Sequence, residues 1–131
     1  MTNRVWTIPK ERMKAGREHR VPLSDRCIEI LNALPDLEGY VFKKQKSEKP
    51  LSDGAFRALM DRMEVDAFTP HGFRSSFRDW AAEASEGHSW DTIELALAHS
   101  VANKTEAAYR RGIQLEKRKK LMQHWQNFLI S

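Results

Sequence analysis

The chain has 131 residues, of which 31% are charged and 40% hydrophobic, and this suits one domain around one core. Its 22 Lys and Arg outnumber 18 Asp and Glu, and the net charge of +4 points mildly to a polyanionic partner. The single cysteine, Cys27, excludes an internal disulfide and fits a reducing compartment. No CxxC or HExxH pattern predicts a metal site, no apolar run approaches the roughly 18 residues of a membrane span, and the N-terminus lacks a signal peptide's apolar core. We therefore expect a cytoplasmic protein with no membrane partner.

The first 23 residues predict a β-hairpin. Residues 5–8 are β-prone and end at Pro9, and residues 19–23 form a second extended run. The connection between them, residues 10–18, is basic and contains Gly16. Residues 4–9 already resemble a segment from inside a folded domain. We therefore expect a truncated gene or an excised segment.

A helix is expected directly after the hairpin. Ser24 or Asp25 can cap it, and Pro35 stops it. A brief apolar run at residues 40–42 follows, and then a Lys-rich loop at residues 43–50. We expect this loop to be the most mobile internal segment.

The rest of the chain predicts helices only. Ser52 or Asp53 can cap the next helix, in which Phe56, Leu59, Met60 and Met63 recur at helical spacing. Further helices are expected over residues 71–84, 89–97, 104–111 (ending at Gly112) and 114–129.

Apolar stripes indicate which helix faces are buried. One face of the 71–84 helix carries Phe73, Phe77, Trp80 and Ala81. The last helix carries a stripe of five, namely Leu121, Met122, Trp125, Phe128 and Leu129. This stripe can pack on its own domain or dock on a neighbouring subunit. The predicted class is α+β, mainly α: a single domain over 1–131, with a short hairpin at 3–23 and a helical bundle at 24–131.

His71 and Arg74 are candidates for phosphate binding. Residues three apart share a helix face, and a helix N-terminus adds amide donors and a positive dipole end. A guanidinium and an imidazole aimed together from such a site suit a phosphate. Taken alone, HxxR is a weak pattern, equally satisfied by a capping histidine and a solvated arginine.

Three further residues can each have a structural or a functional role. His99 ends an apolar helix and can be a half-buried structural histidine or a phosphate ligand. Tyr109, between two alanines and two arginines, can be a core residue or a phenol that approaches a backbone phosphate. Lys14 can be one charge of a solvated turn or an ammonium that reaches a leaving oxygen. Spacing alone leaves these choices open.

The order of these motifs resembles the C-terminal catalytic domain of tyrosine recombinases, especially prophage integrases of the P4 type. The resemblance covers nearly the whole chain. It rests on six segments in the same order: residues 6–9, 12–14, 19–24, 69–74 (Thr-Pro-His-Gly-Phe-Arg), 107–112 (Ala-Ala-Tyr-Arg-Arg-Gly) and 121–125.

The resemblance implies a role for each candidate residue. Tyr109 matches the nucleophile that forms a 3′-phosphotyrosyl link, and Arg74 matches the second of two arginines that clamp the phosphate. His71 matches a histidine assigned to proton transfer, His99 one that hydrogen-bonds the phosphate, and Lys14 the hairpin lysine that protonates the leaving 5′-oxygen. No cofactor is implied, because the covalent link conserves the phosphodiester for religation. The basic residues expected to contact DNA are Arg12, Arg17, Arg110 and Arg111.

The chain also departs from the family pattern. Residues 6–9 match a part of the fold that follows the first clamping arginine, so no residue fills that role. Loss of one donor of this kind typically costs two to three powers of ten in rate, and we expect impaired cleavage by this chain alone. The implied partners are double-stranded DNA attachment sites and other recombinase subunits in a DNA-bound tetramer. The alternatives are a non-catalytic DNA-binding remnant or regulatory fragment, and an unrelated basic helical protein.

Overall fold

The computed structural model describes residues 4–34, 39–44, 47–83, 87–99 and 107–131, and for residues 107–113 only the backbone. Their elements are β1 (Val5–Ile8), a 3₁₀ turn (Lys10–Arg12), β2 (His19–Pro22), α1 (Asp25–Asn32), α2 (Ala55–Arg62), α3 (Gly72–Glu83), α4 (Trp90–Ala96) and α5 (Ala107–Leu129). The predicted α+β, mainly helical class is confirmed. None of the helices in these residues combines the length and the apolar run needed to cross a membrane.

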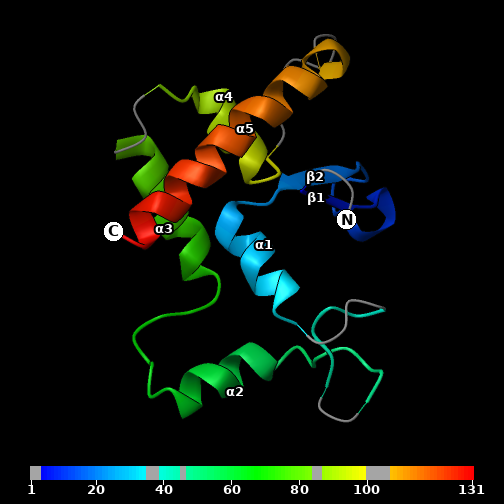
Figure 1. The fold of residues 1–131 in the computed structure, drawn as a ribbon, viewed down its shortest axis with the longest axis vertical. Coiled ribbons are helices and arrows are strands. Elements are labelled where there is room, and N and C mark those ends of the chain that lie inside the picture. The colour runs from blue at the N-terminus through cyan, green and yellow to red at the C-terminus, as the bar shows by residue number, and fades with distance from the viewer. Residues whose placement is uncertain (1–3, 35–38, 45–46, 84–86, 100–106) are drawn as a thin grey trace.

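The predicted hairpin forms. β1 and β2 pair antiparallel, with Val5 opposite Pro22 and Ile8 opposite His19. In the connection, Gly16 has a φ of 61°, a left-handed conformation that glycine adopts without steric cost. The hairpin projects from one side of the molecule (Figure 1).

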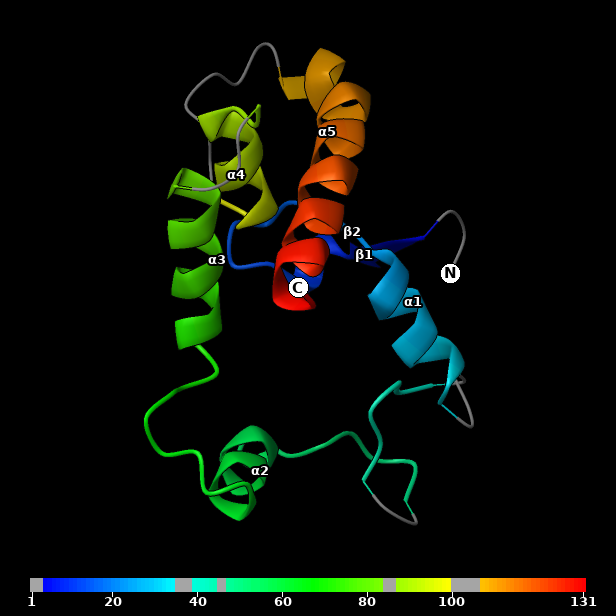
Figure 2. The ribbon, with the colours of Figure 1, turned by 60° about the vertical axis from the view of Figure 1, so that its left-hand side comes forward.

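The core lies where α3, α4 and α5 meet, and α5 crosses in front of the other two helices in Figure 1. Figure 2 shows the same three helices from another side. Leu121 of α5 is fully buried at its centre. Trp125, one turn further along α5, packs edge-on against Phe77 of α3, with ring centroids 5.6 Å apart. Complete burial of a leucine or phenylalanine side chain contributes about 1.5–3 kcal/mol to the free energy of unfolding. The buried members of the cluster are Phe77, Trp80, Ala81, Ile93, Leu97 and Leu121.

One long helix, α5, replaces the two helices predicted around Gly112. The prediction of a break at that glycine is wrong. The first residues of the predicted 104–111 helix, residues 104–106, lie outside the described residues. A glycine inside a helix costs about 1 kcal/mol relative to alanine. Burial of Leu115 and Leu121 on the same helix offsets that cost.

One prediction about an apolar face is wrong, and both interpretations of the stripe on the last helix stay open. Phe73 is 63% exposed, although Phe77 and Trp80 on the same helix are buried as predicted. The core reaches only the later turns of α3, so the face around Phe73 has no helix opposite it. At the C-terminus, Phe128 and Leu129 are also more than half exposed.

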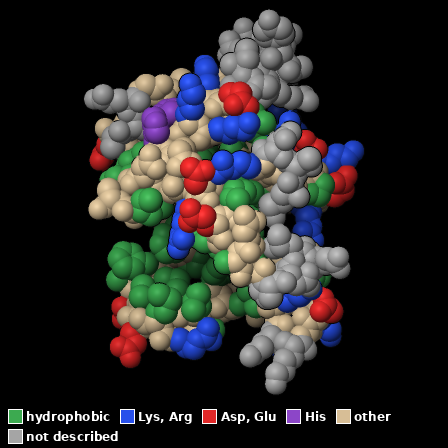
Figure 3. Space-filling view, viewed as in Figure 1, with side chains coloured by type: hydrophobic (Ala, Val, Ile, Leu, Met, Phe, Trp, Pro, Cys, Tyr) green, Lys and Arg blue, Asp and Glu red, His purple; other side chains and the backbone are tan. Residues whose placement is uncertain are grey.

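Helix α2 stands apart from the other helices in both views (Figures 1 and 2). It begins at Ala55 with Gly54 as its N-cap, one or two residues later than predicted. Phe56 and Met63 of its apolar stripe are about 60% exposed. Figure 3 shows hydrophobic side chains gathered at lower left, over α2 and the segment that leads to α3.

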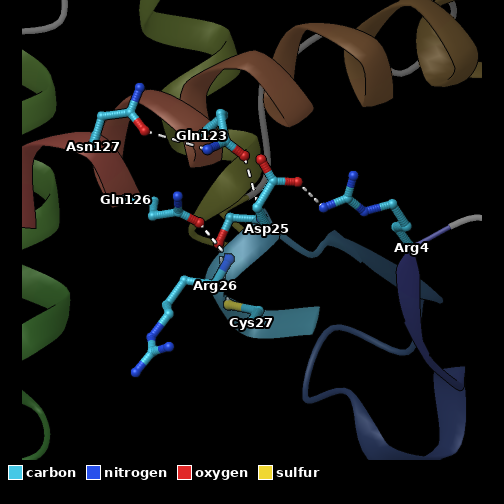
Figure 4. Close-up of polar contacts among 8 residues, drawn as sticks. Arg4, Asp25, Arg26, Cys27, Gln123, Gln126 and Asn127 are labelled. Carbon is cyan, nitrogen blue, oxygen red and sulfur yellow. Dashed lines mark hydrogen bonds and ion pairs between the residues drawn. The ribbon is translucent and has the colours of Figure 1, made fainter. Parts of the chain in front are cut away.

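The N-terminus of α1 is capped by side chains from α5, almost 100 residues later in the chain (Figure 4). The backbone N–H of Asp25 donates to Gln123 Oε1 at 3.3 Å, and that of Arg26 donates to Gln126 Oε1 at 2.5 Å. The first amides of a helix have no partner inside it, so these two glutamines satisfy groups that would otherwise face water.

The residue predicted to cap α1 has a different role. Ser24 is the N-cap residue, as predicted, but its hydroxyl donates to Cys27 Sγ at 3.3 Å instead of accepting from the backbone. An ion pair between Arg4 and Asp25 joins the start of β1 to the same end of α1 (Figure 4). The hairpin, α1 and α5 therefore meet at one junction.

A histidine pair joins the segment before α4 to α5. His88 Nε2 and His124 Nδ1 are 3.0 Å apart. Burial, and then the positive charges of His124 and Lys120, lower the pKa of His88 from its ordinary value. The uncharged ring is the form that fits this position.

We expect the glutamine caps to stabilise the junction. Replacing both, Gln123→Ala with Gln126→Ala, removes two hydrogen bonds and should lower the free energy of unfolding by about 1–3 kcal/mol. Urea unfolding followed by circular dichroism measures this. Lys117→Ala, an exposed position on the same helix, is the matched control. A double variant within about 0.5 kcal/mol of the control would show that the caps contribute nothing specific.

The His88 environment predicts a stability that depends on pH. Because the pKa of His88 is lower in the folded than in the unfolded chain, the unfolded state binds the proton first as the pH falls. The free energy of unfolding should therefore decrease as the pH drops through the ordinary histidine range, and less steeply in His88→Gln. Urea titrations between pH 8 and pH 5 test this. Identical slopes for the two proteins would contradict it.

Candidate functional site

Arg74 and His99, two residues predicted to contact a phosphate, lie together. Arg74 is in the first turn of α3, and His99 follows the C-terminal end of α4. Arg74 Nη2 is 2.7 Å from His99 Nε2, and it also donates to the carbonyl oxygen of Leu97. Residues 25 positions apart in sequence thus form one polar cluster between two helix ends.

The way α4 ends explains why His99 faces Arg74. The N–H of His99 donates to the carbonyl of Glu94 at 2.9 Å, and the N–H of Ala98 donates to that of Leu95 at 3.2 Å. This is the hydrogen-bond pattern of a Schellman motif, in which the residue after the helix adopts a left-handed conformation. Ala98 does so, with a φ of 58°. The chain reverses there and directs His99 back along the helix, while the Leu97 carbonyl accepts from the Arg74 guanidinium.

Glu94 completes the cluster. Its Oε2 is 2.6 Å from His99 Nδ1, and its Oε1 is 3.4 Å from Arg78 Nε. The hydrogen bond with His99 is the largest influence on the pKa of Glu94 and lowers it, and the charge of Arg78 adds to this against the opposing effect of burial. Arg78 also lies over the Trp90 ring, 5.1 Å from its centroid. Glu94 is therefore held as a carboxylate between two partners.

A second basic group lies close to Arg74. His19 of β2 is partly buried, and its pKa is lowered first by burial and then by the charges of Arg118 and Arg74. Arg118 of α5 is only 8% exposed, and its Nη1 donates to the carbonyl oxygen of Arg20 at 2.7 Å. Its Nε is buried and has no hydrogen-bond partner among the described residues. The imidazole on the hairpin therefore feels the positive charge of one arginine on α3 and one on α5.

Among the described residues, no side-chain hydrogen bond joins this cluster to four of the other predicted residues, namely His71, Lys14, Arg12 and Arg17. His71, just before α3, is exposed, and its backbone carbonyl accepts from the Arg74 N–H at 3.1 Å. Lys14, Arg12 and Arg17 are exposed on the hairpin connection. The roles predicted for Tyr109, Arg110 and Arg111 fall on side chains that lie outside the described residues, although all three belong to the first turns of α5.

Sequence reasoning missed three residues of this site. Glu94 lies five positions before His99, but only the left-handed turn at Ala98 brings the two side chains together. His19 and Arg118 come from β2 and α5, and nothing in the spacing of the sequence connects them. No group of three or more His, Cys, Asp or Glu in the described part of the chain could hold a metal ion.

Comparison with known proteins identifies the family. A model of the phage integrase family matches residues 1–114. Prophage integrase IntA of Escherichia coli (strain K12) is 37% identical over 125 residues, which cover 92% of this chain and 30% of that protein. The integrase of Shigella phage Sf6 is 31% identical over 135 residues, or 97% of this chain and 34% of that protein. The integrase of Enterobacteria phage P4 is 31% identical over 145 residues, or 95% of this chain and 33% of that protein.

No solved structure matches the chain. The chain spans about a third of the length of the curated relatives it matches. The family match nevertheless extends over most of its residues, and each relative aligns along nearly all of it. The chain therefore belongs to the phage integrase family.

Proposed function

We propose that the chain is part of a site-specific DNA recombinase that breaks and rejoins strands through a 3′-phosphotyrosyl intermediate. The observation that carries this proposal is the 2.7 Å approach of Arg74 to His99, which places a guanidinium and an imidazole where one phosphate can contact both. Family membership supports the same reaction class, since the relatives are named integrases.

In the proposed reaction, the Tyr109 phenol oxygen attacks the phosphorus of a DNA phosphodiester. The bond to the 3′-oxygen stays, a bond from phosphorus to Tyr109 forms, and the bond to the 5′-oxygen breaks. His71 accepts the phenol proton, and Lys14 gives a proton to the leaving 5′-oxygen. Arg74 and His99 stabilise the charge that develops on the non-bridging oxygens. Attack by a 5′-hydroxyl on the same phosphorus reverses these steps and rejoins the strand.

Arg74 keeps donors for this task. Its Nη2 serves Leu97 and His99, and a guanidinium carries five N–H groups in all. Neither Nη1 nor Nε has a partner among the described residues, so these groups can bind a phosphate oxygen. Exposed Arg12 and Arg17 on the hairpin, with Arg110 and Arg111 on α5, add the positive charge expected to follow the DNA backbone. A DNA substrate supports the expectation that the protein is cytoplasmic.

We expect the chain alone to be a weak enzyme. The first clamping arginine of the family has no counterpart in it, and loss of one such donor costs two to three powers of ten in rate. On DNA, the working unit would be a tetramer of full-length subunits at attachment sites. The alternative is a DNA-binding remnant or regulatory fragment without chemistry.

Covalent capture on DNA tests the proposal. A nicked suicide duplex should give a small amount of protein–DNA adduct, at a rate 10²–10³-fold below that of a full-length relative such as IntA. Tyr109→Phe should abolish the adduct and change the affinity for DNA less than twofold, because the phenol oxygen supplies the nucleophile and little binding energy. Denaturing gels and salt-dependent binding curves measure the two quantities.

Tyr40→Phe is the matched control, since Tyr40 is the other tyrosine of the chain and is exposed at a distance from the site. It should leave the adduct unchanged. No adduct from the unaltered chain, with DNA binding retained, would favour the non-catalytic alternative. An adduct that persists in Tyr109→Phe would overturn the assignment of the nucleophile.

A further inference from the structure

Glu94 uses both carboxylate oxygens inside the site, although it is not among the residues that the family resemblance assigns. One oxygen faces His99 Nδ1 at 2.6 Å and the other faces Arg78 Nε at 3.4 Å. The side chain is only 15% exposed, which is unusual because glutamates are mostly exposed. A carboxylate repels a phosphate, so its place beside Arg74 and His99 requires an explanation.

The hydrogen bonds fix the tautomer of His99. A carboxylate only accepts, so the proton between Glu94 and His99 belongs to Nδ1 of the ring. A guanidinium only donates, so Nε2 of the same ring accepts from Arg74. Both contacts are satisfied together only by the neutral ring with its proton on Nδ1.

The backbone reinforces this arrangement. The His99 N–H donates to the Glu94 carbonyl at 2.9 Å, so the two residues are joined through both main chain and side chain. Ala98, between them, is left-handed, a conformation that is unfavourable for a residue with a Cβ atom. A conformation of this kind persists where the surrounding structure holds it, and it is frequent at functional sites.

We propose that Glu94 is a positioning residue, which holds His99 with its proton on Nδ1 and its Nε2 on the phosphate-binding side of Arg74. When Nε2 takes up a proton from the solvent, the ring becomes positively charged and donates a hydrogen bond from Nε2 to a phosphate oxygen. The Glu94 carboxylate then neutralises the charge on the ring. Glu94 itself touches no DNA. This role rests on the proposed function.

A purely structural role is the competing explanation. Glu94 could serve only as the ion-pair partner of Arg78 that joins α4 to α3. That pair is weak, since its atoms are 3.4 Å apart and the Arg78 side chain is 48% exposed. The structural role predicts a loss of stability in Glu94 variants with no change in the protonation pattern of His99.

Nuclear magnetic resonance on protein with ¹⁵N-labelled histidine reads that pattern directly. At pH 8, His99 should show a proton on Nδ1, slow to exchange and shifted downfield by its hydrogen bond, with the signal assigned by its loss in His99→Gln. Glu94→Ala should remove this proton or spread it over both tautomers. Glu116→Gln, an exposed carboxylate of α5, should leave it unchanged. The same Nδ1 signal in Glu94→Ala and in the unaltered protein would overturn the proposal.

The adduct rate on suicide DNA provides the second measurement. Glu94→Gln should lower the rate about 10–100-fold, the usual effect of losing an orienting partner, and should add nothing in a His99→Gln background. Simple charge repulsion predicts the opposite, a faster reaction once the carboxylate is gone, and a rate that is unchanged or raised would overturn the proposal. If the unaltered chain forms no adduct, the recombinase proposal fails while the resonance measurement still decides the role of Glu94.

Discussion

The C-terminal end of α4 is the constraint on which the site depends. A helix leaves its last carbonyls without partners, and this end carries the negative pole of the helix dipole. Here the Leu97 carbonyl accepts from the Arg74 guanidinium, and the left-handed Ala98 turns His99 to the same group. One helix end therefore satisfies its own backbone, fixes an arginine from another helix and presents an imidazole beside it. Without that turn, Arg74 and His99 would be two unrelated surface residues.

Helix α5 joins this site to the rest of the molecule. Leu121 fills the centre of the core between α3 and α4, and Gln126 caps α1. Arg118 bonds to the backbone of β2 with a guanidinium that is almost wholly buried. Arg118 has no acidic partner among the described residues, and burial of such a charge is costly. The buried guanidinium lies at the contact between the helix that carries Tyr109 and the hairpin that carries Lys14. The three contacts, made at successive turns, set the position of the whole helix.

The hairpin, the class of the fold and most helix positions follow from local patterns, because β-prone runs, capping residues and apolar spacing act over a few residues. The burial of Phe73 and the break at Gly112 were predicted wrongly, because both depend on what lies opposite the helix. Arg74 and His99 were found through their motifs. Glu94, His19 and Arg118 were not, since their roles arise from a left-handed turn and from contacts between elements far apart in the sequence.

The exposure of the apolar side chains on α2 also depends on what lies opposite the helix. The apolar side chains of α2 recur at the spacing of a core helix, but none of them is buried among the described residues. The chain spans about a third of the length of the curated relatives it matches. Among the described residues, no hydrogen bond or ion pair joins α2 to the residues around Arg74.

A structure of the chain bound to a DNA duplex tests the central claim most directly, through the distance between the Tyr109 hydroxyl oxygen and the nearest guanidinium nitrogen of Arg74. If both groups act on one phosphate, they must lie about 4–7 Å apart, within one chain or between adjacent protomers. A phenol held far from every Arg74 in the complex, with the DNA phosphates contacting neither Arg74 nor His99, would contradict the claim that these residues form a strand-exchange site.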